Sequence, residues 1–572
     1  MRVWFFWMLG AVVSAFVGVL DASGAERVGR RAIRLNQLGY EPSAPKQFVV
    51  RNPPSRSFEV MTIGPDVRWR TVGGGDLKPV EGVNGLWTGD FSEIRTPADY
   101  RIVCSKERVG STACGHPPAD SDDAVWSYDF VVKSNVCDTA ERMVLDFFTW
   151  QRCGSEKGWA GVCHQDPVTL YGTDRRLDLR GGYHQSGDLR GWADGMSMAL
   201  YGLLRWAERR DPAWDVGRID EELRWGIDYF LKLVGPEGYA YDSQFVPIGW
   251  GPRDYYPSPA PFLAQCNIVM LLARAARRFA GTDAVRADKC LSTTRRMWKD
   301  LGENPAYDTY YRPPVEPLPP GTQGTNFWWQ SYRSCGTGIA GLACAALELY
   351  RTTREAPYAA AAKSHARRLL ALQIKEGPLS GAYRLEPGKD DLSFLGCVYG
   401  YGIHGWRTAY EFAREFPDEP EWRESALAVC DLFVRAWNAA GGEYLAMPTT
   451  RGFGTGDPVW SDKPFVTHLM RGTGASGLML RSLLLSEAAE AFGRDDYRLV
   501  AQRMFDYVLG ANPRGHSYFT GIGWENERVN VYGQFFPSTP SMPGGMSHVM
   551  DGEYDLPPAG LFLWACTALK TR

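Results

Sequence analysis

Apolar positions along residues 138–572 recur at the spacing of amphipathic helices, and Gly, Pro and Asp separate the recurrent stretches. We count twelve such stretches. They lie near residues 138–151, 193–209, 218–233, 261–279, 285–300, 336–352, 356–374, 399–415, 420–437, 471–492, 494–509 and 557–569. The pattern predicts a mainly α domain, although periodicity alone does not give the arrangement of the helices.

The preceding residues 30–133 have a different texture, with short β-rich runs between Gly, Pro and Asp turns. The runs are Gln47–Val50, Phe58–Ile63, Trp87–Phe91, Tyr100–Cys104 and Tyr128–Val132. Several short strands at this spacing are typical of an immunoglobulin-like sandwich.

The first 25 residues have the composition of a secretory signal. Arg2 provides a positive start, residues 3–20 are apolar, and small residues at 22–25 offer a cleavage site. Left uncleaved, the apolar stretch is long enough to anchor the chain in a membrane. We therefore expect a secreted or periplasmic protein, in which the twelve cysteines could form disulfides.

Composition narrows the class of partner. A net charge of −3 without a basic run argues against nucleic acid as a partner. Aromatic residues make up 13% of the chain and crowd three long segments, at residues 239–258, 309–332 and 440–465. Flat rings in such loops either line a cleft for sugars or pack over helix ends, and we favour the sugar cleft.

Residues 181–188 read Gly-Gly-Tyr-His-Gln-Ser-Gly-Asp. This segment resembles the Gly-Gly-Trp-His-Asp-Ala-Gly-Asp loop of glycoside hydrolase family 9, whose members are inverting endoglucanases. Residues 33–40 also resemble the start of the immunoglobulin-like module found before many catalytic domains of that family. The resemblance covers roughly residues 30–570. After the signal at 1–25, it implies a β-sandwich at 30–133 and an (α/α)6 toroid as the catalytic domain at 138–572.

Cys153, Cys163, His164 and His184 form the sharpest metal candidate, because two thiolates and two imidazoles satisfy the tetrahedral preference of zinc. A Cys153–Cys163 disulfide is the alternative that the residues leave open. Similarity to family members in which Cys and His residues surround a structural zinc favours the metal. The ion would then brace the loop that carries Asp188. Calcium is compatible with the acid-rich loops, but no regular ligand spacing assigns residues to it.

The general base implied by the resemblance is Asp188, at the end of the loop. The family's other loop aspartate is replaced here by Gln185, which cannot act as a base but can accept a hydrogen bond from water. Its neutrality also removes a like charge that would raise the pKa of Asp188. Asp178 or Asp194 could supply the missing carboxylate.

The general acid is expected just before the last helix. The family's Asn-Glu motif is absent, and Glu553 stands nearest to its place, with Asp551 and Asp555 as alternatives. A general acid must have its pKa raised by apolar surroundings, which Tyr554 could help to provide.

These residues predict an exported glycoside hydrolase that cleaves β-linked glucan or a related polysaccharide by inversion, with Asp188 as base and Glu553 as acid. Two alternatives share the scaffold. One is a non-catalytic carbohydrate-binding protein, and the other is an exo-acting glycosidase on a different chain, such as one of aminosugars. In each case the partner is a polysaccharide or oligosaccharide.

Overall fold

A computed structural model of the chain describes residues 31–570, with gaps at residues 82, 114, 170–173, 187–190, 192, 210–214, 246–255, 309–331, 385, 389–404, 440–474, 513, 525–544 and 548–553. The expected signal at 1–25, Asp188, Asp551 and Glu553 lie outside the described residues, as do most of the three aromatic segments.

Two antiparallel sheets form the N-terminal part of the molecule. One sheet has the order β1-β2-β6-β5, and the other has the order β10-β7-β3-β4-β8 with β9 beside β7. The strands are β1 (Ile33–Arg34), β2 (Gln47–Arg51), β3 (Ser57–Ile63), β4 (Arg68–Asp76), β5 (Lys78–Pro79), β6 (Leu86–Asp90), β7 (Ala98–Ser105), β8 (Ser111–Ala113), β9 (Ala124–Trp126) and β10 (Phe130–Val132). Phe48 and Phe58, one from each sheet, meet edge to face at 5.0 Å between ring centroids. The expected immunoglobulin-like sandwich is confirmed.

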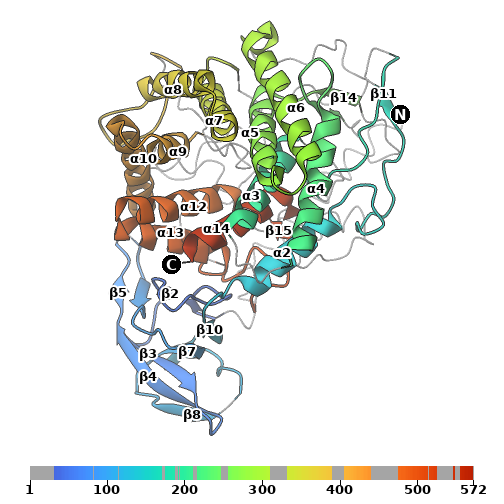
Figure 1. Cartoon of the computed structure of the whole chain (residues 1–572). Helices are drawn as coiled ribbons and strands as arrows, with labels where there is room; N and C mark the ends of the chain where they lie inside the picture. Colours follow the sequence, from blue (N-terminus) through green and yellow to red (C-terminus); the bar gives the residue numbers. More distant parts are fainter. Residues whose placement is uncertain are drawn as a thin grey trace, which may run out of the picture.

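Helices make up most of the remainder, and Figure 1 shows them above the sandwich. Within the described residues there are twelve. They are α2 (Asp138–Trp150), α3 (Ala193–Arg209), α4 (Val216–Leu233), α5 (Phe262–Phe279), α6 (Ala284–Glu303), α7 (Gly336–Thr353), α8 (Ala356–Ala371), α9 (Thr408–Glu415), α10 (Pro420–Ala439), α12 (Ala475–Phe492), α13 (Asp495–Val508) and α14 (Leu556–Leu569). None of them is long and apolar enough to cross a membrane.

The helices divide into an inner and an outer set. Helices α3, α5, α7, α12 and α14 are buried on nearly all sides, whereas α4 and α6 bury one stripe at helical spacing. The inner helices pack in the order α12, α14, α3, α5 and α7, and α7 adjoins the short α9. Outer helices α6, α8, α10 and α13 each pack on the preceding or following inner helix. This alternation is the expected (α/α)6 toroid.

Helix α14 approaches α3 closely enough to exclude side chains from the contact. A Cβ on Gly202 would lie 2.4 Å from the carbonyl oxygen of Gly560, and a Cβ on Gly560 would lie 2.2 Å from that of Ala199. The last helix of the chain is thereby seated beside the helix that follows the 181–188 loop.

The sandwich and the toroid share hydrogen bonds that involve buried polar side chains. Asn36 donates through Nδ2 to Oδ1 of Asp506 on α13 at 2.8 Å. Gln37 donates through its backbone N–H to the Leu509 carbonyl at 2.9 Å, and through Nε2 to the Gly515 carbonyl at 2.6 Å. The segment before β2 therefore supports the loop that follows α13.

Candidate active site and metal centre

Two short segments next to the toroid run antiparallel and place two of the expected metal ligands. The Cys153 N–H donates to the Gly182 carbonyl at 2.9 Å, and the His184 N–H donates to the Gln151 carbonyl at 2.8 Å. Cys153 follows α2, and His184 lies in the loop before α3. The pairing thus joins the end of one helix to the motif before another.

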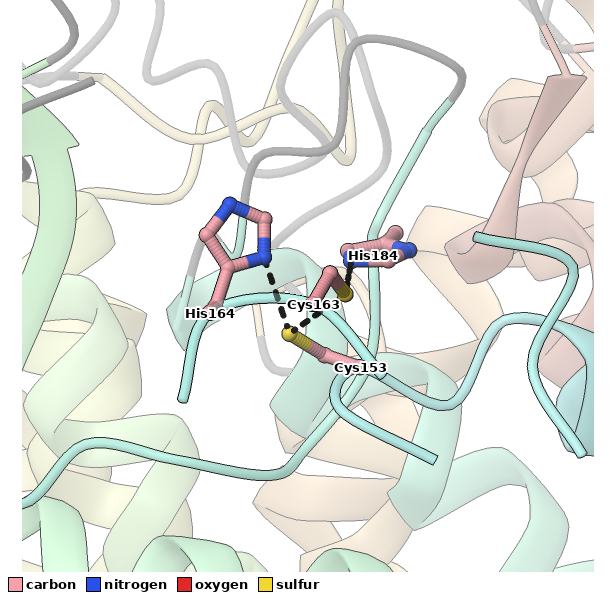
Figure 2. A group of neighbouring side chains, drawn as sticks. All are labelled: Cys153, Cys163, His164 and His184. Atoms are coloured by element: carbon pink, nitrogen blue, oxygen red, sulfur yellow. Dashed lines mark hydrogen bonds between the residues drawn. The ribbon is translucent and has the colours of Figure 1, made fainter. Parts of the chain in front are cut away.

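The turn after Cys153 returns Cys163 and His164 to the same place, as Figure 2 shows. The Cys153 and Cys163 sulfurs are 3.8 Å apart, and no disulfide joins them. Nδ1 of His164 lies 3.3 Å from the Cys153 sulfur, and Nε2 of His184 lies 3.3 Å from the Cys163 sulfur. All four donor atoms lie within 4.8 Å of one another.

The electrostatics of the cluster favour a thiolate at Cys163. A hydrogen bond from the Cys153 thiol, assisted by those from both imidazoles, lowers the pKa of Cys163. The backbone N–H of Gly154 also donates to the Cys163 sulfur at 3.2 Å. Among the described residues, this is the one group of three or more Cys, His or acidic side chains placed to hold a metal.

A buried ion pair holds the two segments against α4. Glu222 accepts two hydrogen bonds from the Arg152 guanidinium, at 2.8 and 3.0 Å, one from the Tyr183 hydroxyl at 2.9 Å and one from the Thr149 hydroxyl at 2.8 Å. The Arg152 and Glu222 side chains are 5% and 1% exposed, so the pair is shielded from water. Sequence analysis did not identify Glu222, since a glutamate on an amphipathic helix usually faces solvent.

The second half of the loop meets the segment that begins the last helix. Ser186 and Asp555 form an antiparallel bridge, and the Leu556 N–H donates to the Gln185 carbonyl at 2.8 Å. Asp555 also pairs with Met546, and Met546 with Phe519, so three distant segments converge at this loop. The structure therefore brings the loop before Asp188 and the segment after Glu553 together.

The other acidic candidates occupy different surroundings. Asp178 is partly exposed, and hydrogen bonds from Arg180 lower its pKa. Asp194 is fully buried at the start of α3, where its Oδ1 accepts from the Gly195 N–H at 2.7 Å. Asp555 is 1% exposed, which makes it poorly accessible to a substrate.

Gln185 is buried beside α3, with 5% of its surface exposed. A Cβ on Gly195 would lie 2.4 Å from Oε1 of Gln185, so the carboxamide rests directly against the first turn of the helix. The absence of a side chain at Gly195 gives Gln185 its space.

Comparison with known proteins identifies the family. Residues 138–536 match the model of glycosyl hydrolase family 9, and residues 29–109 match that of the cellulase N-terminal Ig-like domain. The chain is similar to a cellodextrinase of Butyrivibrio fibrisolvens, at 22% identity over 86% of this chain and 85% of the relative. It is also 24% identical to endoglucanase C of Cellulomonas fimi, over 90% of this chain but only 46% of that longer protein.

Solved structures agree on the fold. A metagenome-derived glycoside hydrolase family 9 endoglucanase matches with a TM-score of 0.66 and 18% identity, over 94% of this chain and 99% of the other. A zinc-binding triple mutant of the family 9 endoglucanase J30 also has a TM-score of 0.66, with 17% identity over 93% and 99% of the two chains. The chain belongs to glycosyl hydrolase family 9, and it carries the N-terminal Ig-like domain.

Proposed function

From its membership of this family of glycoside hydrolases, we propose that the protein cleaves β-linked glucan chains by inversion, with Asp188 as general base and Glu553 as general acid. The observation that carries the assignment is the antiparallel bridge between Ser186 and Asp555. Residues 188 and 553 each lie two positions from that bridge. The bridge thus joins the segment that leads to Asp188 to the segment that follows Glu553.

The surroundings of the bridge suit a division of roles between the two carboxyls. Tyr554 and Leu556 are buried, and Tyr554 packs edge to face on Phe147 at 5.7 Å. Apolar neighbours of this kind keep an adjacent acid protonated, as protonation of the leaving oxygen requires. Asp188 would deprotonate the attacking water, and Gln185 would hold its carboxamide at the edge of that site without adding a competing charge.

The names of the similar proteins favour glucose chains as substrate, since they include a cellodextrinase and an endoglucanase. A family 9 structure similar to this chain was also solved with a cellobiose-like isofagomine. Reducing-end release across a panel of β-glucans, xyloglucan and aminosugar chains would identify the sugar. Viscosity loss measured in parallel separates internal cleavage from release of terminal units.

Substitution tests the assignment of the two carboxyls. Asp188→Asn and Glu553→Gln should each lower the turnover number by roughly 10²–10⁴-fold, the usual contribution of a general acid or base. Asp555→Asn is the matched control, because its side chain is buried beside the same loop. Full activity in either of the first two variants would overturn the proposed pair, and a wild type that binds glucans without turnover would overturn the hydrolase.

We also propose that Cys153, Cys163, His164 and His184 hold one structural zinc ion. Bonds of about 2.3 Å to sulfur and 2.0–2.1 Å to nitrogen in a tetrahedron place two sulfurs about 3.8 Å apart and a sulfur and a nitrogen about 3.6 Å apart. The corresponding separations here are 3.8 Å and 3.3 Å, so the donors fit the ion. A metal with four protein ligands supplies a cross-link between loops and has no open position for catalysis.

Elemental analysis of the purified protein tests the zinc site. We expect about one zinc per chain, and loss of that zinc in Cys163→Ser. Metal-free wild-type protein with a Cys153–Cys163 disulfide would contradict the assignment.

We place the enzyme outside the cytoplasm on the basis of its first 25 residues. Expression in the native host, followed by N-terminal sequencing of the exported protein, tests that placement.

A further inference from the structure

A cavity of about 280 Å³ lies at the C-terminal ends of α3, α5, α7 and α9. Helix α3 begins at Ala193 near Gln185 and reaches the cavity at Arg205, twelve residues later. At 1.5 Å per residue this is roughly 18 Å along the helix axis. The cavity is therefore at the opposite end of the toroid from the 181–186 loop, and the proposed hydrolysis does not use it.

Arginines dominate the lining. Seven of them line the cavity, together with three glutamates, Glu411, Glu415 and Glu487. Three neighbours complete the described cluster: Arg407 and Glu348 contact it from the adjoining small cavity, and Glu208 pairs with Arg274 at its edge. Eight arginines thus face five glutamates among the described residues, which leaves a surplus of three positive charges.

The buried glutamates are each shared by several arginines. Glu348 receives arginines from α5 and from its own helix, at nitrogen–oxygen distances of 2.7–3.1 Å. Glu487 receives arginines from α3 and from the start of α9, at 2.5–3.5 Å. These carboxylates are therefore already paired. None of them is left to neutralise the surplus arginines.

The pKa values of these glutamates report the sign of the local potential. Burial alone raises the pKa of a carboxyl, yet the arginines around Glu348, Glu411 and Glu487 outweigh burial and lower the pKa of each. A site that keeps three buried carboxylates ionised also favours an anion that enters it from solvent.

Helix ends offset part of this potential. Helices α3, α5, α7 and α9 end at the cavity, and each C-terminus carries about −0.5 of a charge. Together they compensate about two of the three surplus charges, so one remains. Donors remain as well. Arg414 lines the cavity without an ion pair to a described residue, and the Nε of Arg205, a side chain 7% exposed, has no hydrogen-bond partner there.

We propose that this cavity binds a tetrahedral oxyanion, of which inorganic phosphate and sulfate are the representatives. A water molecule takes about 30 Å³ of liquid volume, so the cavity has room for such an ion with part of its hydration. Arginine presents a planar fork of donors that matches the oxygens of these ions in pairs. The bound ion would tie α3, α7 and α9 together at the end of the toroid remote from the catalytic loop.

Calorimetric titration of the full chain with sodium phosphate, in chloride buffer of constant ionic strength, tests the site. We expect one saturable site in the wild type. Arg414→Gln should weaken its binding at least threefold, and the double variant Arg354→Gln/Arg414→Gln at least tenfold. Arg354 is 63% exposed and pairs with Glu415 at 2.7 Å. The matched control is Arg367→Gln on α8, which removes an arginine 56% exposed and paired with Glu419 at 2.7 Å.

Thermal unfolding provides the second readout, since phosphate and sulfate also stabilise proteins without binding them. The comparison is therefore between variants at the same phosphate concentration. The rise in Tm should be as large in Arg367→Gln as in the wild type and smaller in the double variant, which keeps only the non-specific part. Absence of saturable binding to the wild type would overturn the proposal. So would equal phosphate affinity in Arg414→Gln and wild type. Neither result bears on hydrolysis, which is assayed separately.

Discussion

The Glu222→Gln substitution examines whether the buried ion pair holds the proposed metal centre in place. Among the described residues, Glu222 is the one fully buried carboxylate that contacts Arg152. Its oxygens accept both from that guanidinium and from the Tyr183 hydroxyl. Removing one partner of a buried pair costs about 3–5 kcal/mol, because the remaining charge is left uncompensated. We expect the lower end, about 3 kcal/mol, since Gln keeps one acceptor oxygen and Arg152 keeps its bond to Glu221.

Two measurements follow from this magnitude. At roughly 2 °C for each kcal/mol in a domain of this size, the Tm of the zinc-loaded protein should fall by about 6 °C. Zinc affinity, measured by transfer to a chromophoric chelator, should fall by about 10–100-fold, as is usual when a support of a metal ligand is removed. Both effects arise because Arg152 and Tyr183 directly adjoin Cys153 and His184.

Glu221→Gln is the matched control. This neighbouring side chain also accepts from Arg152, at 2.9 Å, but it is 49% exposed. Exposed ion pairs contribute less than about 1 kcal/mol, so the control should lose at most about 2 °C in Tm and retain its zinc. Equal effects of the two substitutions on Tm and on zinc transfer would refute the argument from burial.

Two further predictions concern the domain contact and the helix contact. Burial raises the pKa of Asp506 to about 7. Between about pH 3.9 and 7 the folded protein therefore binds one more proton than the unfolded chain. Its stability falls as the pH rises through that window. Asp506→Asn keeps the oxygen that accepts from Asn36 and should remove this loss of stability. If the Tm difference between pH 5 and pH 8 is the same in the variant and the wild type, Asp506 is not the group that titrates. Gly202→Ala places its Cβ against the Gly560 backbone and should destabilise the fold by about 1–3 kcal/mol. Gly302→Ala on α6 meets nothing within 4 Å and should leave the Tm at or above that of the wild type, because Ala favours a helix. Equal Tm values for the two variants would show that α3 and α14 can separate.

Local periodicity was sufficient to predict the helices. The expected stretch at 193–209 matches α3 at both ends, because an inner helix of the toroid is apolar throughout and begins and ends at loops. Helix α9 is an exception, since its described part begins at Thr408 and not near 399. Strand β4 was not predicted, because Gly73–Gly75 obscure its alternation and its neighbours on the sheet supply its pairing.

The sequence by itself determined the donors of the metal candidate, since two cysteines and two histidines are chemically distinctive wherever they stand. Only the tertiary structure shows that the two sulfurs lie 3.8 Å apart without a disulfide and that all four donors gather within 4.8 Å, an arrangement consistent with a shared metal. It also brought Ser186 to Asp555 across more than half of the chain.

The sequence also determined the fold class and the resemblance of residues 181–188 to the family's catalytic loop. Both depend on patterns that are local in the chain. Tertiary structure alone revealed the support from Glu222 and the arginine-lined cavity, whose members come from helices far apart in sequence. The physical reason is that desolvation and charge pairing depend on distance in space. A glutamate at helical spacing looks the same in sequence whether it faces water or, like Glu222, is buried against an arginine that neutralises it.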